Sequence, residues 1–131
     1  MRQIIKMVKK NILSILVALI ILYLSLANSE TFKKVPLIDI PNFDKVIHFL
    51  MYFGLMSVII FENRRTIKSN KQLFLVALIP LFYGILMELL QSALTSTRSC
   101  SFFDAVFNSI GIVVSILLWL RFKQSLKDRF K

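Results

Sequence analysis

Four long runs of apolar residues, separated by short polar connections, dominate the chain. A membrane-spanning helix needs about 20 apolar residues, whereas a helix of a soluble bundle needs a polar stripe, which the first and fourth runs lack. The pattern therefore predicts an all-α, polytopic membrane protein in which residues 1–131 form a single domain with four transmembrane helices and a basic tail. The predicted helices cover residues 11–27, 46–61, 73–94 and 105–120, and the tail covers residues 121–131.

The basic residues are distributed unevenly between the two ends of these helices. The chain is 56% apolar, yet its 17 Lys and Arg give it a net charge of +10. Thirteen of the 17 lie before the first run, between the second and third, or after the fourth. In a four-span topology these segments share one side, which the positive-inside rule places in the cytoplasm together with both termini. The charge is thus explained by membrane lipids and topology, and no nucleic-acid partner is expected.

The first run also has features of a secretory signal peptide. A basic segment precedes it, and Ser25-Leu26-Ala27 has the small-x-small form of a cleavage site. Cleavage there would leave three spans and an N-terminus outside the cytoplasm. The second run begins on the outer side in both cases. Cleavage therefore does not change the side of the membrane on which the polar residues of the later runs lie.

Ionisable and amide residues interrupt the second, third and fourth apolar runs only near their predicted outer ends. An ionisable side chain at the centre of a membrane helix costs about 2.5–3.5 kcal/mol on insertion scales, so each one needs a partner or a purpose. Because the second, third and fourth runs meet the outer side, these residues predict a ligand-binding cavity in the outer leaflet. The candidate ligand-binding residues are Asp44, Lys45, His48, Tyr52, Glu88, Gln91, Arg98, Asp104 and Asn108.

The chemistry of this set is that of a polar binding site more than of an enzyme. Asp44 precedes His48 by one helical turn and is expected to orient its imidazole. Arg98 is suited to a carboxylate or phosphate. His48 and Glu88 are the candidates for acid–base catalysis, but no clear nucleophile accompanies them, so enzymatic activity stays uncertain. With one His, one Cys and no nucleotide-binding motif, the sequence predicts no metal site and no cofactor.

Each of these residues also has a structural interpretation. Asp44 and Asp104 could be N-caps of their helices. Glu88 could form an ion pair with Arg98. Gln91 and Asn108 could form hydrogen bonds between helices.

The spacing of the polar residues resembles that of the VanZ-like family of small bacterial membrane proteins. The motifs that carry the resemblance are Asp44-Lys45-x-x-His48-Phe49-x-x-Tyr52, Glu88-x-x-Gln91 and Arg98-x5-Asp104-x3-Asn108-x2-Gly111. The resemblance covers about residues 44–112. It implies a location in the bacterial cytoplasmic (inner) membrane, a role in the cell envelope, and a contribution to resistance against teicoplanin-type glycopeptide antibiotics.

Three functions remain open at this point. The first is binding of a lipid-linked cell-wall precursor or a lipoglycopeptide. The second is a hydrolase or transferase that acts on a lipid phosphate or a lipid-linked glycan. The third is a structural or assembly role, with Gly111 and Ser115 as the surface that contacts partners. The oligomeric state stays open in all three.

Overall fold

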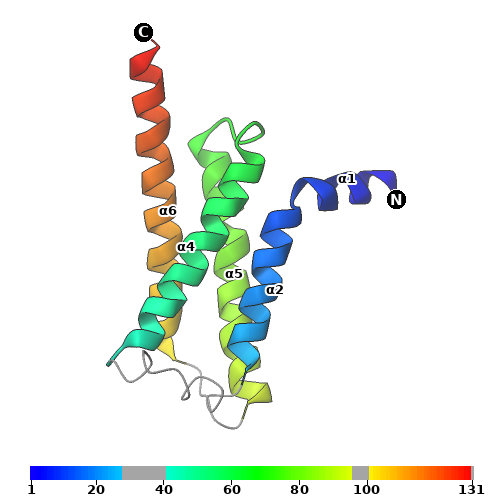
Figure 1. Ribbon diagram of the computed structural model, residues 1–131, viewed down its shortest axis with the longest axis vertical. Helices are drawn as coiled ribbons and strands as arrows, with labels where there is room; N and C mark the ends of the chain where they lie inside the picture. The colour runs from blue at the N-terminus through cyan, green and yellow to red at the C-terminus, as the bar shows by residue number, and fades with distance from the viewer. Residues whose placement is uncertain (28–40, 96–100, 131) are drawn as a thin grey trace.

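The computed structural model describes residues 1–27, 41–95 and 101–130, and within these ranges all regular structure is helical. The all-α prediction is therefore confirmed for the described residues. The helices are α1 (Arg2–Lys10), α2 (Ile12–Leu26), α4 (Phe43–Asn63), α5 (Asn70–Leu94) and α6 (Phe102–Arg129) (Figure 1).

Three of these helices, α4, α5 and α6, are long and apolar enough to cross a membrane. A fourth span is obtained if α1 and α2, which are bent by 72° at their junction, count as one. The predicted first span coincides with α2, whereas the separate α1 was not predicted. The predicted basic tail continues α6 as far as Arg129. Large apolar side chains such as Phe74, Phe82 and Leu117 point outward, as expected of a surface that faces lipid.

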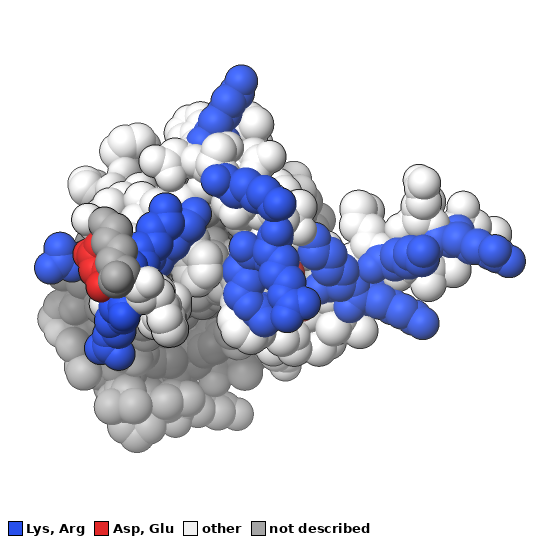
Figure 2. Space-filling view, turned by 90° about the horizontal axis from the view of Figure 1, so that it is seen from above, with Lys and Arg blue, Asp and Glu red and all other residues white. Residues whose placement is uncertain are grey.

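The two ends of the bundle differ in their chemistry. One end carries α1, the connection between α4 and α5, and the C-terminal part of α6 (Figure 1). Every described Lys and Arg except Lys45 belongs to these segments or, in the case of Lys71, to the first turn of α5 beside them. Figure 2 shows the basic side chains gathered over this end. The other end holds the start of α4, the end of α5 and the start of α6.

Helices α4 and α6 form the most extensive helix pair, and small residues let them approach closely. A Cβ atom at Gly111 would lie 2.9 Å from the backbone nitrogen of Phe53 and closer still to the carbonyl oxygen of Phe49. Four residues further along α6, the Ser115 hydroxyl forms a 2.8 Å hydrogen bond with the Ser57 hydroxyl of α4. Gly111 and Ser115 are thus buried inside the chain, so the suggestion that they contact partner proteins is wrong for this structure.

A carboxylate from α4 caps the start of α2 at the basic end of the bundle. The backbone nitrogens of Leu13 and Ser14 donate to the two oxygens of Glu62, at 2.8 and 3.1 Å, and the Ser14 hydroxyl also bonds to this carboxylate. Asn11, at the N-cap position, makes no side-chain capping bond. Glu62 therefore satisfies the first free N–H groups of α2 and places a negative charge at the positive end of its dipole. No local sequence pattern predicts this role, because Glu62 lies 48 to 49 residues after the groups that it caps.

The close approach at Gly111 gives a prediction with a matched control. Gly111→Ala should lower the free energy of unfolding by about 1–3 kcal/mol, because the methyl group meets the backbone of α4. Gly54, on α4, has no atom within 4 Å of its Cβ position. Gly54→Ala should therefore leave stability unchanged or raise it by up to about 1 kcal/mol. Denaturant unfolding of both variants in detergent micelles measures the difference, and equal effects would contradict the proposed packing.

Candidate functional site

Three helices bring four of the nine candidate residues together at the less basic end of the bundle. His48 comes from α4, Glu88 from α5, and Asp104 and Asn108 from α6, and all four are buried. The Nδ1 atom of His48 forms a 3.0 Å hydrogen bond with Oδ1 of Asn108. Glu88 Oε1 lies 3.6 Å from the same nitrogen, and Asp104 Oδ2 lies 3.6 Å from Nε2. We call these four residues the polar cluster.

Helix ends fix the positions of the two aspartates. Helix α6 begins after Ser101, whose hydroxyl accepts a 3.4 Å hydrogen bond from the backbone nitrogen of Asp104. The N-cap of α4 is Asn42, which has a positive φ of 63°. Asp44 and Asp104 therefore lie in the first turns of their helices, and the suggestion that they are N-caps is wrong. The backbone nitrogen of Ser101 also donates to Oε2 of Glu88 at 3.4 Å, which joins the start of α6 to α5.

Asp44 and Lys45 lie outside the polar cluster. The Asp44 side chain is 58% exposed and pairs with Lys45 at 3.5 Å. The prediction that Asp44 orients the imidazole is wrong, because Asn108 takes that position from the facing helix. Asp44 shares a helical face with His48, but it lies one turn nearer the end of α4.

Gln91 has a structural role and is not part of the cluster. Its Nε2 donates a 2.8 Å hydrogen bond to the carbonyl oxygen of Ser25, which ties α5 to α2. This agrees with its interpretation as a hydrogen bond between helices. The predicted anion contact, Arg98, lies outside the described residues.

Tyr52 is fully buried beside the cluster, on the same face of α4 as His48. Its ring packs against Gly84 of α5, where a Cβ atom would lie 3.1 Å from Tyr52 Cε1 and 3.3 Å from Asn108 Nδ2. Within the described part of the chain, the Tyr52 hydroxyl, Asn108 Nδ2 and Asp104 Oδ1 are buried without a hydrogen-bond partner. Buried polar atoms are nearly always paired, so these three atoms are available to form hydrogen bonds with a ligand or a water molecule.

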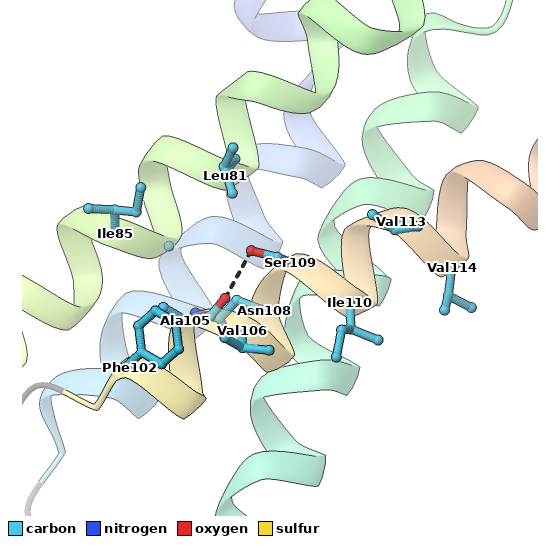
Figure 3. Close-up of a pocket in the computed structure, with 11 residues that line it drawn as sticks. Leu81, Ile85, Phe102, Ala105, Val106, Asn108, Ser109, Ile110, Val113 and Val114 are labelled. Atoms are coloured by element: carbon cyan, nitrogen blue, oxygen red, sulfur yellow. Dashed lines mark hydrogen bonds between the residues drawn. The ribbon is translucent and has the colours of Figure 1, made fainter.

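An apolar groove between α5 and α6 borders the cluster (Figure 3). It has a volume of about 390 Å³, which is within the size range of small-molecule sites. The Ser109 hydroxyl donates to the carbonyl oxygen of Ala105 at 2.9 Å, so this side chain bonds to its own helix (Figure 3). Asn108 therefore lines the groove and also belongs to the cluster. The lining residues are Leu81, Gly84, Ile85, Phe102, Ala105, Val106, Asn108, Ser109, Ile110, Val113 and Val114.

The cluster also contains a possible metal-ligand set. His48, Glu88 and Asp104 each offer one ligand atom, and these atoms lie within 4.8 Å of one another. No metal site was predicted from the sequence, because metal ligands were sought as residues closely spaced along the chain. His48, Glu88 and Asp104 come from three different helices. The same imidazole, lying between two carboxylates, could also transfer protons.

The helices and the cluster define a class: a multi-pass helical membrane protein with a buried polar site at one end. The VanZ/LLP1 family model matches residues 3–123, and the chain belongs to this family. The predicted resemblance is therefore confirmed, and it covers more of the chain than the motifs alone indicated. No curated protein and no solved structure matches the chain.

The unpaired hydroxyl of Tyr52 gives a prediction that separates ligand binding from folding. Tyr52→Phe removes a buried hydroxyl without a partner, so the free energy of unfolding should stay constant or rise. The control is Tyr83, whose hydroxyl donates to the carbonyl oxygen of Ala18 at 2.5 Å. Tyr83→Phe should lower the free energy of unfolding by about 0.5–1.5 kcal/mol. If unfolding in detergent shows equal losses for both variants, Tyr52 has a structural partner and the interpretation is wrong.

Proposed function

We propose that the protein binds a lipid-linked molecule of the bacterial cell envelope. The hydrocarbon chain of the ligand occupies the apolar groove, and its polar head lies at the polar cluster. The observation that carries this proposal is the position of Asn108, which lines the groove and bonds to His48 within the cluster. An apolar pocket with a few convergent polar groups is the usual form of a small-molecule site.

The chemistry of the cluster favours a head group rich in hydroxyl and amide groups. The carboxylates of Glu88 and Asp104 accept hydrogen bonds from sugar hydroxyls and peptide N–H groups. The Tyr52 hydroxyl and Asn108 Nδ2 can donate to carbonyl oxygens. A lipid-linked wall precursor combines sugars, peptide and a hydrocarbon chain, so it fits both parts of the site. Arg98 is our proposed contact for the phosphate of such a lipid.

The distribution of charge supports an outward-facing site. The described Lys and Arg, apart from Lys45, lie at the opposite end of the bundle from the cluster. Cytoplasmic segments of membrane proteins carry the excess of basic residues. We therefore place both termini in the cytoplasm and the cluster in the outer leaflet of the cytoplasmic membrane, where lipid-linked wall precursors are used.

The same site suits a lipoglycopeptide antibiotic. Teicoplanin-type molecules carry sugars, a peptide and an acyl chain, which are the groups that the cluster and the groove accept. We therefore extend the proposal to a contribution to teicoplanin-type resistance, either by binding the drug or by binding the precursor that the drug targets.

One observation favours a second candidate function. His48 lies 3.6 Å from the carboxylates of both Glu88 and Asp104, an arrangement that can supply an acid and a base. A hydrolase or transferase that acts on a lipid phosphate or a lipid-linked glycan would use the same site. It would convert the bound lipid, whereas a binding protein would not.

A binding assay with the purified protein in detergent tests the proposal. The probes are a fluorescent polyprenyl-pyrophosphate wall precursor and teicoplanin. Ala105→Phe should lower the affinity for the precursor at least tenfold, because the added ring fills the groove that Ala105 lines. His48→Ala should lower it by a similar factor, because it removes a group from the polar cluster.

Ala93 provides the matched control, because it is exposed on α5 and does not line the groove. Ala93→Phe should bind the precursor as the wild type does. Displacement of the precursor by an equal concentration of phosphatidylglycerol, or equal losses in both phenylalanine variants, would contradict a specific lipid site. Appearance of a product during the incubation would favour the enzyme.

A further inference from the structure

We propose that His48, Glu88 and Asp104 bind one divalent transition-metal ion, of the type of Zn²⁺ or Mn²⁺. All three ligands come from the chain itself, so this site does not require the lipid proposed above. One imidazole with two carboxylates is a ligand set that borderline first-row metal ions accept.

The distances within the cluster suit ligands of one ion better than direct hydrogen bonds. His48 Nε2 and Asp104 Oδ2 are 3.6 Å apart, which is too long for a hydrogen bond. Nitrogen and oxygen ligands bind Zn²⁺ at about 2.0–2.2 Å in a tetrahedral arrangement, so two ligand atoms lie about 3.4 Å apart. The three ligand atoms already lie within 4.8 Å of one another. A movement of about 1.4 Å by one carboxylate, from 4.8 to about 3.4 Å, brings even the longest of these separations to the required spacing.

Asn108 forms a hydrogen bond with the imidazole of His48 of the kind that metal-binding histidines usually form with a neighbouring oxygen. Its Oδ1 lies 3.0 Å from His48 Nδ1 and accepts a hydrogen bond from the N–H group at that nitrogen. The other ring nitrogen, Nε2, is then the free ligand atom, and it faces Asp104. Glu88 Oε1 lies 3.6 Å from Nδ1, so its carboxylate has to turn toward Nε2 to bind the same ion. A hydrogen bond from the second ring nitrogen to a carbonyl or carboxylate oxygen is the common outer-shell feature of such sites.

An unpaired oxygen is the second, independent indication of a bound ion. Asp104 is more than nine-tenths buried, and its Oδ1 has no hydrogen-bond partner among the described residues. A carboxylate oxygen in this state is unfavourable unless it contacts a cation or a donor that completes it. A divalent ion bound by both oxygens of Asp104 would pair Oδ1. It would also neutralise the two carboxylates, so that an open position on the ion could accept a phosphate oxygen.

Metal titration of the chelator-stripped full-length protein in detergent tests this site. Calorimetry with Zn²⁺ and with Mn²⁺ should show one ion per chain for at least one of the two metals. Glu88→Gln and Asp104→Asn should each weaken that binding at least tenfold, because each removes an anionic ligand. The control is Asp44→Asn, which removes an exposed carboxylate one turn from His48 and should leave the affinity unchanged.

A spectroscopic measurement on the wild-type protein tests the metal site without any variant, so its result does not depend on whether the variants fold. The chain has a single histidine, so the imidazole signals of ¹⁵N-histidine-labelled protein all belong to His48. Addition of Zn²⁺ should shift the Nε2 signal and leave Nδ1 protonated. Absence of binding by either metal, loss of binding in Asp44→Asn, or binding that leaves the His48 signals unchanged would overturn the proposed site. Metal binding without precursor binding would instead contradict the lipid proposal alone.

Discussion

The rest of the site depends on the close contact of α4 and α6 at Gly111. The absence of a side chain there lets the backbone of α6 approach that of α4 next to Phe49 and Phe53. Lipid tails offer no hydrophobic drive for helix association, so close packing and hydrogen bonds between helices hold membrane bundles together. Here the packing at Gly111 is followed by the hydrogen bond between Ser57 and Ser115. One turn of α6 before Gly111, the same contact places Asn108 against His48.

The polar cluster and the groove follow from this contact and from the position of α5. Helix α5 adds Glu88 to the cluster, and Gly84 leaves room for the Tyr52 ring. The resulting site combines a polar end with an apolar groove, and Asn108 belongs to both. Far from this site, Glu62 fixes the start of α2 on α4, so the two ends of the bundle are held by different chemistry. One end gathers the basic residues, and the other gathers buried acids, an amide and the imidazole.

Much of the helical architecture could be predicted from the sequence, because a bilayer requires long apolar helices whose backbone groups are satisfied internally. Likewise, His48, Glu88, Asp104 and Asn108 stood out because polar groups in such helices are rare. The remaining features depend on contacts between distant residues. Glu62 caps a helix that lies 48 to 49 residues earlier in the chain, so no local pattern marks it. The basic residues of α1 were interpreted only as a topology signal, so its bend from α2 was missed.

The roles of individual residues in the predicted site also depend on contacts between helices, which local spacing does not show. Helical spacing correctly put Asp44 and His48 on one face, but it could not show that Asp44 lies beyond the reach of the neighbouring helices. The groove residues are ordinary apolar residues, and only the shape formed by two helices distinguishes them. His48, Glu88 and Asp104 were placed in one site from the sequence, but local spacing does not mark them as ligands of one ion, because they are widely separated in sequence.

The proposed function requires that the end of the bundle with the polar cluster faces outside the cytoplasm. Reporter fusions test it most directly, with alkaline phosphatase, which is active only outside the cytoplasm, joined after Thr95 or after Ser69. Thr95 follows α5 at the cluster end, and Ser69 precedes α5 at the basic end. We expect an active enzyme at Thr95 and an inactive one at Ser69, whether or not the first helix is cleaved. The reverse pattern would place the cluster in the cytoplasmic leaflet and contradict the proposed role.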